Sequence, residues 1–164
     1  MKRLAVCCLA LAGCTAGSLL PAQIKPWVAT GGMNSPESAY VDPGTGLLFV
    51  SQVGGGPMDK DGDGRISKLS LDGSVLAADW VKGLNAPKGL RSFKGTLWTA
   101  DIDEVVGIEI ATGKICCRVK VEGAKFLNDV AVGEDGAVYV SDMLLSRIHR
   151  VKDGRAAVFA EGDE

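Results

Sequence analysis

The sequence predicts an all-β fold of the β-propeller type, built from blades of four antiparallel strands. Beyond residue 22, short apolar runs are separated by turns rich in Gly and Asp, with almost no helical periodicity. The pattern also repeats, because LLFVSQ, TLWTAD and VYVSD superpose with Ser51, Ala100 and Ser141 at equivalent positions. A four-strand unit of about 40 residues is typical of a propeller blade.

The N-terminal segment has the pattern of an export signal. Residues 1–22 carry a basic start, an apolar run and then small residues, which predicts a signal peptide. The apolar run, of about ten residues, is too short to span a bilayer. Two processing sites remain open: the lipobox-like LAGC would make Cys14 the lipidated first residue, and ordinary cleavage would follow Ala22. We therefore expect an exported bacterial protein, either periplasmic or held at the membrane as a lipoprotein through its lipid alone.

An orphan strand is expected to open the mature chain. WVATGGMNSPE, which begins at Trp27, parallels WVKGLNAPK, which begins at Trp80. Because the second segment ends a blade, Trp27 and Val28 are expected to form the outermost strand of another one. Propellers often close their ring with such a strand.

Three complete blades are expected to follow within the partial propeller of residues 23–164. The sequence predicts their extents as about 35–83, 84–122 and 123–162. Closed propellers have roughly four to eight blades, so the prediction is an open, truncated arc. Its two exposed blade faces would be covered by missing C-terminal blades or by self-association.

The first blade is longer than the others because of VGGGPMDKDGDG between its second and third strands. Asp59, Asp61 and Asp63 alternate before Gly64, as at the start of an EF-hand loop, but the twelfth position is Ser70 instead of Glu. One interpretation is a weak Ca²⁺ site, with a dissociation constant on the order of 10⁻⁴ to 10⁻³ M. The other is a solvated Asp-Gly loop that holds no metal.

A polar mouth is expected at one end of the central channel. In an antiparallel blade, the start of the first strand and the loop between the second and third strands lie at the same end. The residues predicted to meet there are Glu37, Lys88, Asp101, Asp103, Asn128, Asp129 and Asp142. Such a ring suits a cation or a hydroxylated ligand. The alternative is that these groups are polar only because loop tips are solvated.

Charge and cysteine content exclude other classes. The formal net charge is −2 and no basic run is present, which argues against a nucleic-acid partner. Of five cysteines, only Cys116 and Cys117 lie beyond the signal segment. Adjacent residues on a strand point to opposite faces, so we expect two free cysteines.

Four segments resemble a known family: SPESAYVDPGTGLLFVSQ, LNAPKGL, TADIDEVVGIEIATGK and KFLNDVAVGEDGAVYVSDMLLSRIHRVKDG. They look like the gluconolactonase and regucalcin-like (senescence-marker-protein type) six-bladed propellers, in particular exported bacterial members. The resemblance covers roughly residues 25–164 and implies the N-terminal half of such a ring. In that family, a Glu, an Asn and an Asp from different blades hold a divalent cation that polarises a lactone carbonyl and activates water. Glu37 matches the Glu, and Asn128 matches an Asn beside the metal.

Two functions follow as expectations. The resemblance implies a metal-dependent lactone or ester hydrolase, with Ca²⁺ favoured and Zn²⁺ or Mn²⁺ as alternatives. Because the other ligands of that family would lie in later blades, we expect this chain alone to be inactive, and no catalytic residue is assigned. The alternative is a non-enzymatic propeller scaffold that binds a small ligand or a protein in the periplasm.

Overall fold

The computed structural model describes residues 32–162 as three antiparallel sheets of four strands each. The first sheet contains β1 (Pro36–Val41), β2 (Leu48–Gln52), β3 (Gly64–Leu69) and β4 (Val75–Leu84). The second contains β5 (Pro87–Phe93), β6 (Thr96–Asp101), β7 (Glu104–Glu109) and β8 (Ile115–Lys120). The third contains β9 (Leu127–Val132), β10 (Val138–Asp142), β11 (Arg147–Lys152) and β12 (Arg155–Glu161). The predicted all-β class with four-stranded antiparallel sheets is confirmed.

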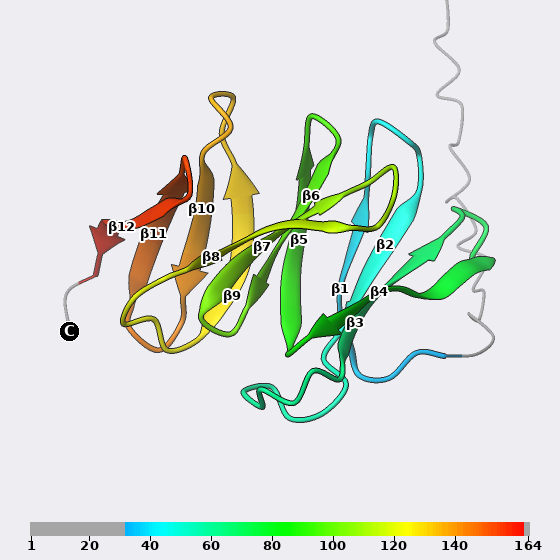
Figure 1. The fold of residues 1–164 in the computed structure, drawn as a ribbon, viewed down its shortest axis with the longest axis horizontal. Helices are drawn as coiled ribbons and strands as arrows, with labels where there is room; N and C mark the ends of the chain where they lie inside the picture. The colour runs from blue at the N-terminus through cyan, green and yellow to red at the C-terminus, as the bar shows by residue number, and fades with distance from the viewer. Residues whose placement is uncertain (1–31, 163–164) are drawn as a thin grey trace, which may run out of the picture.

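The three sheets stand side by side as separate blades (Figure 1). In each of them the strands follow chain order, and the first strands of neighbouring sheets contact one another, β1 with β5 and β5 with β9. These inner strands therefore form the channel side of the arc. The signal peptide, Cys14 and the orphan strand at Trp27 and Val28 lie outside the described residues. No helix within the described part of the chain is long and apolar enough to cross a membrane.

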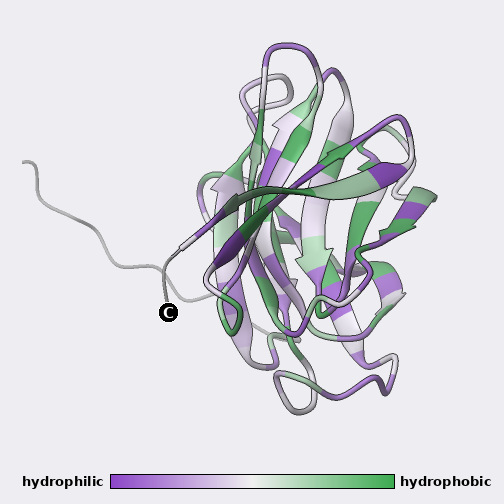
Figure 2. Ribbon diagram, turned by 90° about the vertical axis from the view of Figure 1, so that its left-hand side faces the viewer, coloured by the Kyte–Doolittle hydropathy of each residue, from purple (hydrophilic) through white to green (hydrophobic). Residues whose placement is uncertain are grey.

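Apolar and polar residues form alternating bands of colour along strands (Figure 2). The apolar ones build the cores between the sheets. Phe49 and Leu97 are fully buried in the core between the first and second sheets. Trp98, the next residue along β6, packs against the core between the second and third sheets, which includes Val140. One strand thus supplies apolar side chains to both neighbouring blades, as the two-residue period requires.

The cysteines of β8 match the expectation. Cys116 is exposed, Cys117 is half-buried, and both are free. Burial and the neighbouring Cys116 raise the pKa of the Cys117 thiol, so it is a poor nucleophile at neutral pH.

Candidate functional site

A polar cavity of about 380 Å³ lies along the inner strands of all three sheets. Its lining residues come from β1, β5 and β9: Glu37, Ser38, Ala39, Gly89, Arg91, Asn128 and Asp129. The structure thus brings together three of the residues singled out in the sequence, which are Glu37, Asn128 and Asp129. They reach the cavity from the first and third blades.

A bulge at the start of each inner strand aims these side chains. The pairing register shifts between Pro36 and Ser38 in the first blade, between Pro87 and Leu90 in the second, and beside Asp129 in the third. In the first and third blades, a serine hydroxyl from the second strand contacts the bulge. Ser51 Oγ accepts the Ser38 N–H at 3.1 Å, and Ser141 Oγ accepts the Asp129 N–H at 3.0 Å.

In the second blade Ala100 occupies the equivalent position, and the neighbouring Thr99 Oγ1 donates to the Lys88 carbonyl at 3.4 Å. Bulges re-aim side chains and are frequent beside active sites. The repeat therefore places one re-aimed position per blade at this end of the channel: Glu37, Lys88 and Asn128.

The cavity holds two carboxylates of like charge. Burial raises the pKa of Glu37, the nearby Lys88 opposes that effect, and the charge of Asp129 adds to it. The Asp129 Oδ1 atom accepts the N–H of Val130 at 2.9 Å. The two carboxylates share this cavity with the positive charge of Arg91.

Arg91 is a cavity residue that sequence reasoning missed. Its Nη1 donates to the Leu90 carbonyl at 2.7 Å, and its guanidinium lies 5.6 Å from the centre of the Tyr40 ring. The sequence repeat could have placed Arg91 on an inner strand, because it is equivalent to Tyr40 and Ala131 in the other two blades. A lone arginine in a strand gives no sign of which face it occupies.

Lys88 does not line the cavity, contrary to expectation. Its side chain is buried, and Nζ donates to the carbonyls of Pro57 at 3.0 Å and Ala86 at 2.8 Å. The ammonium also lies 4.5 Å from the centre of the Phe126 ring. Burial lowers the pKa of Lys88, while the charges of Asp101 and Glu37 oppose that effect. Lys88 therefore fastens the long β2–β3 loop to the inner strand β5.

Asp101 and Asp142 were expected at the mouth, but both are buried and occupied by backbone groups. Asp101 accepts the N–H groups of Asn85 at 2.9 Å and Ala86 at 2.7 Å. Asp142 accepts those of Lys125 at 2.8 Å and Phe126 at 3.1 Å. Each carboxylate therefore holds the segment that enters its own blade, and neither lines the channel-side cavity.

Asp103 also has protein partners. Lys60 Nζ donates to its Oδ2 at 2.5 Å, and Lys120 donates to the same oxygen. Although burial opposes the effect, these two hydrogen bonds keep the pKa of Asp103 below its ordinary value. The pair with Lys60 ties the long loop to the second blade, so Asp103 acts as an anchor at the mouth.

The loop of residues 53–63 extends beyond its neighbours at the lower end of the arc (Figure 1). Asp59 Oδ2 accepts the Gly56 N–H at 3.0 Å, and Asp61 Oδ1 accepts the Asp63 N–H at 3.0 Å. Asp63 lines a separate cavity on the outer side. Among residues 32–162, no group of three or more His, Cys, Asp or Glu side chains is placed to hold a metal. The structure therefore does not gather the three aspartates, and calcium binding here stays a prediction.

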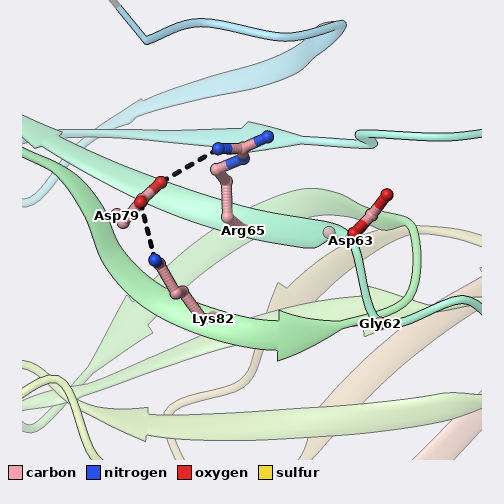
Figure 3. A pocket seen from close by; sticks show the side chains of 6 residues that line it. Gly62, Asp63, Arg65, Asp79 and Lys82 are labelled. Carbon is pink, nitrogen blue, oxygen red and sulfur yellow. Dashed lines mark hydrogen bonds and ion pairs between the residues drawn. The ribbon is translucent and has the colours of Figure 1, made fainter.

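That separate cavity has a volume of about 150 Å³ and is already ion-paired (Figure 3). Asp79 accepts from Arg65 at 3.0 Å and pairs with Lys82 at 2.8 Å. These hydrogen bonds lower the pKa of Asp79. Because Asp79, Arg65 and Lys82 are paired with one another, this cavity has fewer unpaired charges for a ligand than the channel-side one.

His149 lies away from the channel. It is buried on β11, its Nε2 lies 3.9 Å from Asp142 Oδ2, and within the described chain that nitrogen has no hydrogen-bond partner. Burial lowers the pKa of His149, whereas the charge of Asp142 opposes this. The imidazole is therefore a core group between the second and third blades and no part of the candidate site.

Comparison with known proteins supports the fold alone. No family model matches the sequence, and no curated protein matches it. Solved structures do match the fold. A nidogen/laminin complex gives a TM-score of 0.58 at 18% identity, covering 78% of this chain and 48% of that one.

Two further propeller structures have enzyme names. Virginiamycin B lyase from Staphylococcus aureus gives a TM-score of 0.56 at 16% identity, covering 80% of this chain and 43% of the lyase. A gluconolactonase-like protein gives 0.54 at 21% identity, covering 74% and 46%. The chain thus spans less than half the length of each of these structures.

Proposed function

We propose that the channel-side cavity holds a divalent cation, and that a complete ring of this type is an exported, metal-dependent hydrolase of lactones or esters. The observation that carries the proposal is the meeting of Glu37, Asn128 and Asp129 on one cavity between blades. The fold shared with a gluconolactonase-like protein and a lyase supports an enzymatic role by analogy. Export rests on the N-terminal sequence.

The residues of the cavity fit a hard cation. Glu37, Asn128 and Asp129 offer only oxygen ligands, which Ca²⁺ prefers. One oxygen of Asp129 accepts the Val130 N–H, which leaves the other for a cation. Mn²⁺ suits carboxylate and carbonyl oxygens as well. Zn²⁺ is less favoured because no His or Cys lines this cavity.

The chemistry would be divided between the ion and the protein. A bound divalent cation acts as a Lewis acid towards a carbonyl and lowers the pKa of its bound water. Glu37 and Asp129 would hold it, and the Asn128 amide would orient a carbonyl or hydroxyl. Arg91 brings a positive charge to the same cavity, which suits the hydroxyl or carboxylate groups of a small hydroxylated substrate.

We expect the purified protein to bind Ca²⁺ and Mn²⁺ weakly, and Glu37→Gln to lower that affinity at least tenfold. Loss of one carboxylate removes both a ligand and half of the local negative charge. Because burial raises the pKa of Glu37, affinity should also fall as the pH drops through that raised value. Isothermal titration calorimetry measures both effects. Glu134→Gln, outside the cavity, is the matched control and should leave the affinity unchanged.

The β2–β3 loop offers a competing site, and the same titration separates the two. A triple variant with Asp59, Asp61 and Asp63 changed to Asn should keep the affinity that Glu37→Gln removes. If the triple variant abolishes binding while Glu37→Gln does not, the ion binds the loop and the channel proposal is wrong.

A monomer of this chain should hydrolyse lactones no faster than buffer containing the same metal. The three blades supply cation ligands from only two of them, so a bound ion would remain mostly hydrated and would not hold a carbonyl in a defined position. A panel of aldonolactones followed by pH-stat measures the rate. Turnover by a monomer that Glu37→Gln removes would show that three blades are sufficient.

A further inference from the structure

A second polar cavity lies between the outer strands of the second and third blades. Its volume is about 480 Å³, compared with about 380 Å³ for the channel-side cavity. The end of β8 and the two residues after it form one wall, and β12 forms the other. Because β8 and β12 are the outermost strands of neighbouring sheets, this cavity lies away from the channel. A ligand bound here would not compete with one in the channel.

The imidazole of His149, on β11, also lines this cavity. The residue is only 3% exposed, and within residues 32–162 its Nε2 atom has no hydrogen-bond partner. The Asp142 Oδ2 atom lies 3.9 Å from Nε2, which is too far for a hydrogen bond, and it already accepts the Lys125 N–H at 2.8 Å. Buried polar groups in folded proteins are normally hydrogen-bonded. The unpaired nitrogen therefore indicates a polar ligand group in this cavity.

Charged side chains lie at the entrance of the cavity. Lys120 and Glu122 are on the β8 wall, Arg155 is on the β12 wall, and all three are exposed. Lys120 shares the Asp103 carboxylate with Lys60, so that carboxylate balances only one of the two lysines. With Lys60 counted, three cations and two carboxylates give this surface a net charge of +1. A single excess positive charge favours a ligand with one negative charge.

Apolar side chains form the rest of the walls. Val121 is buried in the core between the second and third blades, and Ala156 packs against the same core. Val158, which pairs with His149 across β11 and β12, is 51% exposed. The ligand should therefore have a short apolar body beside its charged group. The exposed Glu122 carboxylate would repel a dianion, such as a phosphate monoester at neutral pH.

We propose that this cavity binds a small organic monocarboxylate. The carboxylate would accept a hydrogen bond from His149, and the Arg155 guanidinium would attract it at the entrance. The apolar part of the ligand would contact Val121 and Val158. The site is independent of the channel-side cavity and of any metal ion bound there.

Binding at this site should be linked to the charge of His149. Burial lowers the pKa of this imidazole, Arg147 adds to that effect and Asp142 opposes it, so the ring of the free protein is mostly neutral at neutral pH. A bound carboxylate brings a further negative charge to the ring, which raises its pKa. The affinity should therefore increase as the pH falls from about 8 to 6. The other charged residues at the cavity are Lys120, Glu122 and Arg155. Of all these side-chain types, only histidine ordinarily changes charge between about pH 5 and 8.

Proton NMR of His149 tests the proposal with benzoate as the probe, because the chain contains no other histidine. We expect saturating benzoate to raise the pKa of His149 by about one unit, which corresponds to about tenfold tighter binding to the protonated form. Benzamide, which has the same ring without the charge, should not raise it, and phenyl phosphate should bind less tightly than benzoate. No shift with benzoate, an equal shift with benzamide, or tighter binding of phenyl phosphate overturns the proposal.

Three substitutions locate the bound probe. Arg155→Ala should weaken benzoate binding about threefold, since one exposed charge is lost. Lys114→Ala, at an exposed cation just before β8 and outside the cavity, is the matched control and should leave the affinity unchanged. Arg91→Ala removes the arginine of the channel-side cavity and should leave the pKa shift of His149 unchanged. Equal effects of Arg155→Ala and Lys114→Ala, or loss of the shift in Arg91→Ala, would place benzoate elsewhere and contradict the proposal.

Discussion

Asp101→Ala is expected to lower the free energy of unfolding by about 3 kcal/mol, because it strands two backbone donors. The carboxylate is fully buried and accepts the N–H groups of Asn85 and Ala86 where the chain enters the second blade. An unsatisfied buried donor costs about 1–3 kcal/mol. Arg118, whose Nη1 lies 3.8 Å from Asp101, would also lose a charge partner. Urea unfolding at one fixed protein concentration measures the loss.

Two variants make that result specific. Asp101→Asn keeps one acceptor oxygen and should lose less than the alanine variant. Asp103→Ala removes a carboxylate two positions away whose partners, Lys60 and Lys120, are about half-exposed. Such exposed pairs contribute about 0–1 kcal/mol, so this change should be small. Equal losses at Asp101 and Asp103 would mean that the backbone contacts of Asp101 do not support the blade.

These backbone hydrogen bonds to a buried carboxylate explain why the sequence placed Asp101 and Asp142 at the channel mouth. Asp101 and Asp142 end their second strands as polar residues beside a loop, a pattern that equally fits a ligand group at a channel mouth. The first blade has Gln52 at that position, and its side-chain oxygen accepts the N–H of Asn34. A carboxylate and an amide can both accept backbone N–H groups, so the position needs an acceptor and does not need a charge. Strand periodicity does not show whether such a side chain accepts backbone N–H groups or lines a ligand site.

The repeat, in contrast, was sufficient to predict the sheets. Equivalence of Ser51, Ala100 and Ser141 fixes where each second strand lies, and alternation then assigns the residues on either side to one neighbouring blade or the other. The bulges were not predictable, since each lies at the start of a short strand, where too few residues precede it to show the break in alternation. They lie at Glu37, Lys88 and Asn128 alike, but only Glu37 and Asn128 line the cavity, because the Pro57 and Ala86 carbonyls hold the Lys88 side chain under the β2–β3 loop.

Gly89→Ala is expected to separate two inner strands and damage the cavity. A Cβ added at Gly89 would lie 2.7 Å from the Cα atom of Asp129 on the neighbouring strand β9. That atom belongs to the backbone and cannot rotate away, so β5 and β9 would have to move apart. The sequence gives no hint of this contact, because PKGL resembles an ordinary turn between two apolar runs.

The expected cost of Gly89→Ala is about 2–3 kcal/mol, the upper part of the range for overpacking a well-packed site. The structure gives Gly89 no left-handed φ, so the whole effect is steric. Urea unfolding measures it, and the Ca²⁺ titration should show weaker binding because Asp129 would be displaced. Gly162→Ala is the matched control: its added Cβ would meet Ser146 at 3.4 Å and 3.5 Å, which is ordinary contact, and it should change stability by less than about 0.5 kcal/mol. If Gly89→Ala matched that control in both stability and cation affinity, the close approach of β5 and β9 would not be what shapes the cavity.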